Sequence, residues 1–275
     1  MIPARWRHMM LIRVLRRAAA SALDNNKASG DGEDSIRSVV ELVDELRTIV
    51  ARVESTVSGK EGRSAVIPIM KSLLSLDNEL YKAISVGACK YDNGIHPKHR
   101  LMKYHEFFCK NVGTEDTVLD IGCGNGFLTS DVAKCTSGRV VGIDMNRGNI
   151  DFAKKHYHAD NIEYIYGDVN TDIKPGHFDI VILSNVLEHL SNRVGFLRQV
   201  REKVSPSEFL LRVPMYEREW MVPLKQELGI DYLLDATHEI EYTQEQFFEE
   251  LKAAGLVPEA WEIRWGEIWC CATPE

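Results

Sequence analysis

A glycine-rich turn carries the clearest chemical signal in the chain. Residues 120–126 read DIGCGNG and follow an apolar run directly. Glycines allow the backbone to turn sharply and a ligand to approach the main chain closely. A dinucleotide fingerprint would place its third glycine one position later, where Phe127 stands. Asp120 precedes the first glycine by two residues, where a carboxylate can meet a cationic group and would repel a pyrophosphate. Each glycine taken alone is equally typical of an ordinary turn.

His189 is the residue best suited to act as a base. It follows the apolar run 178–184 (FDIVILS), and α/β sheets bind ligands beyond the carboxyl ends of such strands. The ordinary pKa of a histidine, near 6.5, suits proton transfer at neutral pH. Asn185, Glu188 and His189 stand at positions i, i+3 and i+4, which predicts that they share or neighbour one helical face. The alternative is a plain helix start, in which Glu188 stabilises the helix dipole and His189 is only packed.

The elements that would position these residues alternate from residue 115 onward. Strand-like runs are separated by helical stretches, which predicts a parallel sheet covered on both faces; the runs are 117–121, 139–143, 162–166, 178–184 and 208–213. Near the end, Thr243 and Gln246 form a capping box at the start of a helix that Gly255 ends. Two further runs, 257–264 and 267–273, are joined tightly at Trp265–Gly266, which predicts an antiparallel hairpin.

Through the segment VLDIGCGNGFLT, the chain resembles the class I S-adenosylmethionine-dependent methyltransferases over about residues 96–274. The resemblance implies a seven-stranded Rossmann-like α/β sheet with its last strand antiparallel. It also implies S-adenosylmethionine as cofactor. An acid at the end of the second strand would bind the ribose, and Gly-Asp-Val after the third strand would read the adenine. The cofactor residues implied are Asp120, Gly122, Cys123, Gly124, Asp144, Met145, Gly167, Asp168, Val169 and Ser184.

The segment NVLEHL resembles the E-x-x-E-H motif of quinone-biosynthesis O-methyltransferases and of small-RNA terminal 2′-O-methyltransferases. In those families two glutamates and the histidine bind a divalent metal. Here Asn185 replaces the first glutamate, so the site would lose one charge. Downstream, HEIEYT resembles a segment that supplies a further histidine in the RNA family, and His238 holds that place. The resemblance therefore implies His189, Glu188 and His238 as catalytic residues. They would also be the metal ligands if a metal is present, but a metal-free His189 base is the preferred interpretation.

Residues 214–242 form a long insertion after the fifth strand run, at the edge where a lid would cover the site. Tyr216, Trp220, Tyr232 and Tyr242 could stack on an acceptor, and Arg212 and Arg218 could meet an anion. Residues 217–250 hold ten acids and two bases, which disfavours a nucleic acid. The sequence thus predicts O-methylation of a small-molecule or saccharide-like acceptor. The alternatives are an N- or C-methyltransferase, or a non-catalytic methyltransferase-like partner subunit.

The N-terminal part has a different character. The chain has 275 residues and a net charge of −8, yet residues 1–17 hold five arginines and no acid. We predict a basic tail and linker over 1–35, a helical extension over 36–94 and the methyltransferase domain over 95–275. Apolar residues from Ile36 to Val57 recur at alternating spacings of three and four, which predicts a helix that packs in cis or joins two copies in a homo-oligomer. A second helix is predicted near 69–86, after breaks at Gly59, Gly62 and Pro68.

Composition sets the outer limits of the prediction. With 44% hydrophobic and 27% charged residues, the chain is globular, and no apolar run approaches the roughly 20 residues of a membrane span. The six cysteines include no C-x-x-C pair, and we predict a reduced, cytoplasmic protein. Residues 1–17 are predicted to be a poorly ordered tail. The alternatives are a transit segment or a weak contact with a membrane surface.

Overall fold

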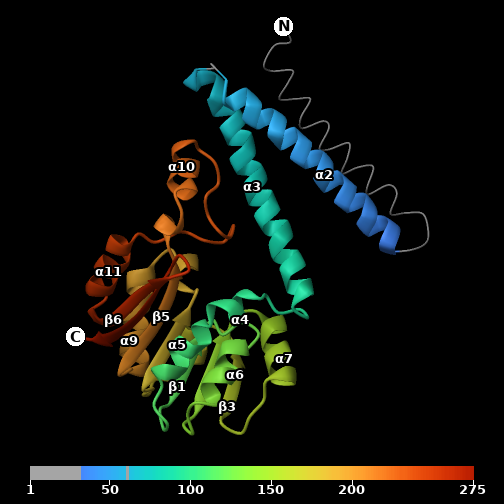
Figure 1. Ribbon diagram of the computed structural model, residues 1–275. Helices are drawn as coiled ribbons and strands as arrows, with labels where there is room; N and C mark the ends of the chain where they lie inside the picture. Colours follow the sequence, from blue (N-terminus) through green and yellow to red (C-terminus); the bar gives the residue numbers. More distant parts are fainter. Residues whose placement is uncertain (1–31, 60–61) are drawn as a thin grey trace. The chain divides into compact units, whose positions relative to one another are not determined.

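The computed structural model describes residues 32–59 and 62–275 (Figure 1). The predictions for residues 1–17 therefore lie outside the described residues. The chain forms two compact units, Met1–Leu73 and Leu74–Glu275. Among the described residues, no helix combines the length and apolar character needed to cross a membrane.

In the first unit, helix α2 (Gly32–Val57) covers the predicted apolar periodicity. Its more covered stripe contains Leu42, Leu46, Ile49, Val53 and Val57, whereas Val39, Val43 and Val50 are about half exposed. Helix α3 (Arg63–Tyr91) begins in the first unit and ends in the second. It starts earlier than predicted because Pro68 lies only one turn inside. At that position the missing N–H of Pro68 leaves one carbonyl, that of the exposed Ser64, without its helical hydrogen bond.

The second unit is built on a seven-stranded sheet, and this confirms the predicted fold class. Its order is β3-β2-β1-β4-β5-β7-β6. The five parallel strands are β1 (Val118–Ile121), β2 (Val140–Asp144), β3 (Ile162–Tyr166), β4 (Ile180–Ser184) and β5 (Glu208–Pro214). The last two, β6 (Leu256–Arg264) and β7 (Glu267–Pro274), form the expected hairpin, and β7 runs antiparallel to both β5 and β6.

Helices cover both faces of this sheet (Figure 1). On one face lie α5 (Tyr104–Lys110), α6 (Phe127–Ala133) and α7 (Arg147–His156), with the short α4 (Lys98–Met102) before them. On the other lie α8 (Val169–Asp172), α9 (Arg193–Val204) and α11 (Gln244–Ala253). The neighbouring Cys270 and Cys271 belong to the opposite cores, as alternation along β7 requires.

Two local predictions near the C-terminus are confirmed. The Thr243–Gln246 capping box starts α11, and Gly255, with φ of +71°, follows its C-cap residue Ala254. Trp265 and Gly266, both with positive φ, make the tight turn between β6 and β7. The order of the strands reverses between β1 and β4, so the carboxyl ends of these two strands mark the place where such a sheet binds ligands.

Candidate active site

The glycine turn connects β1 to α6 at this reversal point. Gly122 and Gly126 have φ of +69° and +80°. A Cβ at Gly122 would lie 2.7 Å from Val186 Cγ2, so only glycine fits there. The backbone N–H of Gly124 donates to Asp144 Oδ2 at 2.9 Å. The turn is therefore tied to the end of β2, and its backbone stays close to the space above β1.

Asp120 is almost fully buried at the end of β1. Thr129 Oγ1 donates a hydrogen bond to its Oδ2 at 2.6 Å. Burial raises the pKa of Asp120 to about 7, and the charge of Asp144 adds to this while the Thr129 bond opposes it. A buried carboxyl of this kind is poised to ionise when a cation approaches.

The other residues that the resemblance assigned to the cofactor follow β2 and β3. Asp144 Oδ1 also accepts the N–H of Asn146 at 2.7 Å, and Met145 is exposed. Asp168 caps α8 by accepting the N–H of Asn170 at 2.8 Å. These side chains lie at the carboxyl ends of neighbouring strands, where a ligand extended along the sheet edge would meet them.

A cavity of about 850 Å³ opens at this edge. The predicted site residues that line it are Asp120, Gly122, Cys123, Gly124, Ser184, His189 and His238. The other predicted residues do not line it: Asp144, Met145, Gly167, Asp168 and Val169 lie outside its wall, and Glu188 is fully buried behind it.

The segment after β4 is folded differently from the predicted α-helix. Leu187–His189 form a single 3₁₀ turn, and Asn185 precedes it with φ of +57°. The expected proximity nevertheless holds, because Asn185 Nδ2 donates to Glu188 Oε1 at 2.7 Å. Burial raises the pKa of Glu188 to about 7. Within the described chain, Glu188 Oε2 and Asn185 Oδ1 are buried without a hydrogen-bond partner.

Two histidines meet beside Glu188. The rings of His189 and His238 are perpendicular, with centroids 4.6 Å apart. One ligand atom from each of Glu188, His189 and His238 lies within 4.8 Å of the others. Burial and the neighbouring His238 lower the pKa of His189. Burial also acts to lower the pKa of His238, but the hydrogen bond to Glu241 and the surrounding carboxylates outweigh it and raise that pKa.

The insertion over residues 214–242 does not supply all the contacts that its sequence suggests. Tyr242 is fully buried and donates to Glu250, so it is not available to stack on an acceptor. Tyr216 and Trp220 also lie outside the cavity wall, and Tyr232 alone of the four aromatic residues lines it.

The two arginines of this region, Arg212 and Arg218, line the cavity, but each is paired with a carboxylate. Arg212 makes a bidentate ion pair with Glu267 at 2.6 Å, and Arg218 binds Glu241 at 2.8 Å. Neither is free for an anion.

Sequence reasoning missed one wall of the cavity. It comes from the end of α3 and the segment before β1, and it includes Tyr81, Lys82, His96, Lys98 and His99. Burial lowers the pKa of His99 to about 3, and the charges of Lys98 and His105 act in the same direction. The dense run of basic residues in HPKHR (96–100) was the signal that could have identified this wall.

Comparison with known proteins shows what the segment that contains the glycine turn is similar to. Residues 119–211 match a family model described as a methyltransferase domain. A ubiquinone biosynthesis O-methyltransferase of Schizosaccharomyces pombe is 36% identical over 36% of this chain and 37% of its own length. A ribosomal protein L11 methyltransferase of Burkholderia mallei is 36% identical over 38% of this chain and 35% of its own length. The chain thus spans little more than a third of these curated relatives.

Solved structures agree on the architecture. An S-adenosylmethionine-dependent methyltransferase from Mesorhizobium loti superposes with a TM-score of 0.51 at 14% identity, covering 61% of this chain and 96% of that one. The sheet order, the glycine turn after β1 and the matched segment agree with one another. Residues 119–211 are similar to a methyltransferase domain, and the fold is shared with a solved S-adenosylmethionine-dependent methyltransferase.

Proposed function

We propose that this enzyme transfers the methyl group of S-adenosylmethionine to an oxygen of a small-molecule or saccharide-like acceptor. One observation carries the proposal: His189, His238 and Glu188 converge within 4.8 Å at the carboxyl end of β4. The same cavity wall contains the glycine turn to which we assign the cofactor. A nitrogen acceptor needs little more than alignment, whereas a hydroxyl must lose its proton, and this cluster offers proton acceptors.

The cofactor would lie across the glycine turn. Its cationic ammonium group is the natural partner for Asp120, and its ribose for Asp144. Asp168 and the backbone of Val169 would meet the adenine. This assignment leaves the sulfonium methyl near Ser184 and Asn185, at the end of β4, where both line the cavity.

The reaction is an in-line displacement. The acceptor oxygen attacks the methyl carbon, the carbon–sulfur bond breaks with its electron pair going to sulfur, and S-adenosylhomocysteine leaves. The acceptor proton passes to a histidine. His189 is suited to this because it lines the cavity and its lowered pKa keeps the ring neutral at pH 7.

A divalent metal is compatible with the same cluster. Glu188, His189 and His238 would hold it, because one ligand atom of each lies within 4.8 Å of the others. The unpartnered Glu188 Oε2 and Asn185 Oδ1 are further oxygens of the kind that such a cation takes. When bound, the ion would favour the deprotonated acceptor and help to orient it.

Substitution of His189 tests the proposal. We expect His189→Ala to lower kcat by about 10²- to 10⁴-fold, the usual contribution of a general base, with little change in S-adenosylhomocysteine affinity. Steady-state kinetics with catechol and sugar acceptors, together with calorimetry, measure both quantities. His158→Ala is the matched control, because His158 is exposed in the loop before β3. Unchanged turnover of His189→Ala would contradict His189 as the general base, whereas a wild-type enzyme that turns over none of these hydroxyl acceptors would favour the nitrogen or carbon alternative.

A further inference from the structure

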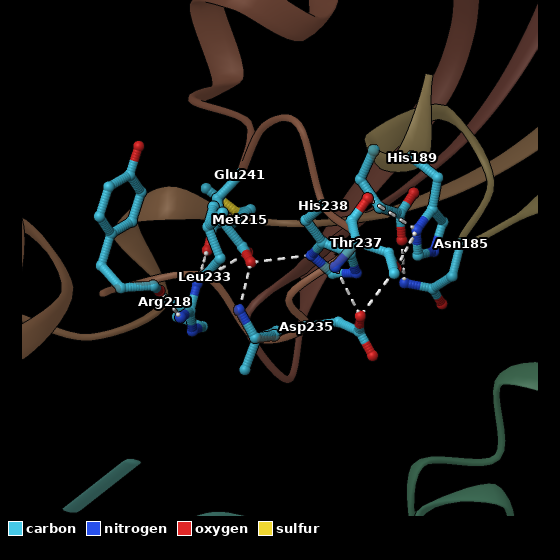
Figure 2. Close-up of polar contacts among 12 residues, drawn as sticks. Asn185, His189, Met215, Arg218, Leu233, Asp235, Thr237, His238 and Glu241 are labelled. Carbon is cyan, nitrogen blue, oxygen red and sulfur yellow. Dashed lines mark hydrogen bonds and ion pairs between the residues drawn. The ribbon is translucent and has the colours of Figure 1, made fainter. Parts of the chain in front are cut away.

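The segment from Asp235 to Glu241 contains His238 and lies beside His189 (Figure 2). It lies between α10 (Met221–Glu227) and α11, and it is anchored to the 3₁₀ turn after β4 because the N–H of Glu239 donates to the carbonyl of Glu188 at 2.7 Å. Each histidine uses its Nδ1 atom to contact this segment. The donors and acceptors at these two contacts decide where each ring carries its proton.

Glu241 fixes the proton of His238. Its carboxylate is fully buried and has three contacts: Arg218 Nη1 donates to Oε2 at 2.8 Å, and the N–H of Leu234 donates to Oε1 at 2.7 Å. The third is His238 Nδ1, 3.0 Å from Oε1. Beside an arginine and an amide donor the carboxylate can only accept. His238 Nδ1 must therefore carry the proton.

Thr237 does the same for His189. Its hydroxyl has one proton, which it donates to Asp235 Oδ1 at 2.7 Å. The hydroxyl oxygen lies 2.9 Å from His189 Nδ1 and can then only accept from it. The Thr237 carbonyl, 3.3 Å from the same nitrogen, is a second acceptor. His189 Nδ1 therefore carries the proton as well.

We propose that Glu241 and Thr237 are positioning residues that hold His238 and His189 in the Nδ1–H tautomer, so that both Nε2 lone pairs serve the Glu188 cluster. Arg218 in turn holds the Glu241 carboxylate in place, and Asp235 holds the Thr237 hydroxyl. Two independent series of contacts support this arrangement, Arg218–Glu241–His238 and Asp235–Thr237–His189. Each series ends at one of the two histidine rings that contact each other. Such partners of catalytic or ligating histidines fix ring orientation and tautomer.

The tautomers can be measured without turnover. With ¹⁵N-labelled full-length protein at alkaline pH, where both rings are neutral, nitrogen chemical shifts distinguish Nδ1–H from Nε2–H rings. We expect both histidines to be in the Nδ1–H form, with His189→Gln and His238→Gln used to assign the signals. An Nε2–H ring at either position in the wild-type protein would overturn the proposal for that histidine.

Two substitutions should act selectively. In Glu241→Gln, the amide cannot accept from Arg218 and from His238 at once, so we expect His238 to lose its Nδ1–H preference while His189 keeps it. In Thr237→Val the hydroxyl acceptor is lost, so His189 should change and His238 should not. Glu239→Gln makes the same chemical change on an exposed neighbour and should leave both rings unchanged. Identical tautomers in all three variants would refute the positioning roles.

The kinetic readout rests on the proposed function. We expect Glu241→Gln to lower kcat about 10- to 100-fold, the usual cost of losing such a partner, with the affinity for S-adenosylhomocysteine within twofold of wild type. If the tautomers change as expected and kcat does not, the positioning holds and the catalytic use of the histidines fails. If the wild type transfers methyl groups but its tautomers differ, the positioning proposal alone fails. Circular dichroism and thermal unfolding identify any variant that does not fold.

Discussion

Asp120 shows how a single buried residue would couple the proposed cofactor site to pH. Its carboxyl has one hydrogen bond, from Thr129, and burial raises its pKa to about 7 from an ordinary value of 3.8. The ionised form is the one that attracts a ligand ammonium group. If Asp120 binds the ammonium group as proposed, a substantial fraction of the free protein near neutral pH has to lose a proton before the cofactor binds well.

We expect S-adenosylhomocysteine to bind more weakly as the pH falls from 8 to 6, with about tenfold lower affinity per pH unit below the pKa of Asp120. Calorimetry in buffers of different ionisation enthalpy should also show proton release on binding near pH 6. Asp120→Asn should bind weakly at every pH and lose this dependence. A wild-type affinity that is constant between pH 6 and 8 would exclude Asp120 as the ammonium partner.

The same shift affects the stability of the enzyme without ligand. The folded pKa lies above the unfolded one, so the native state binds the proton more tightly. The contribution of Asp120 is present below about pH 4 and is lost as the pH rises through about 7. We expect the urea-derived free energy of unfolding to fall across this window less steeply in Asp120→Asn than in wild type. Parallel curves would contradict the raised pKa.

At the scale of elements, the Arg212–Glu267 pair joins β5 to β7. Both side chains are buried, and Glu267 also accepts from Trp269 Nε1 at 3.0 Å. Arg212 lies over the ring of Tyr104 at 3.8 Å, so the pair also contacts α5. The pair therefore holds the antiparallel strand at one wall of the cavity rather than serving a ligand.

We expect Glu267→Ala to destabilise the enzyme by about 3–5 kcal/mol, because it leaves the Arg212 charge buried without a partner. Urea denaturation followed by tryptophan fluorescence measures this loss. Glu262→Ala, on the exposed face of β6 with a 3.6 Å pair to Arg264, should change stability by less than about 0.5 kcal/mol. Equal effects of the two substitutions would show that the Arg212–Glu267 pair is not buried in solution.

Much of the fold could be predicted from the sequence because the features that indicate it are short and local. Short β-branched runs, the glycine turn and the Thr243 capping box are each determined within a few residues, and the structure has them where the sequence places them. The contacts of the lid depend on its path through space. Glu241 meets Arg218 only because residues 23 positions apart fold back on each other, and Tyr242 is buried for the same reason. The spacing of apolar residues along the sequence does not predict such contacts.

The candidate site, too, has a part that short sequence motifs predict and a part that they do not. Glu188, His189 and His238 could be proposed from short motifs, and the structure brings them together. The run HPKHR marks a basic segment, but its place in the cavity wall at Lys98 and His99 could not be predicted, because the run does not fix how the segment before β1 approaches the cavity. The use of helix α2 in a homo-oligomer, and the domain boundaries at residues 35 and 94, stay predictions.

At the scale of the whole molecule, the described residues that line the active-site cavity all lie between Asp77 and Glu267, within the second compact unit. Ligand binding should therefore stabilise that unit. At S-adenosylhomocysteine concentrations of about 100 times Kd, mass action adds about 2.7 kcal/mol, which raises Tm by roughly 5–11 °C for a unit of this size. Val43→Asp combined with Val50→Asp changes only half-exposed positions of α2 in the first unit. We expect this double variant to keep the full ligand-induced shift in Tm, as measured by calorimetry, whereas Asp120→Asn should lose most of it. A reduced shift in the double variant would show that the first unit contributes to cofactor binding.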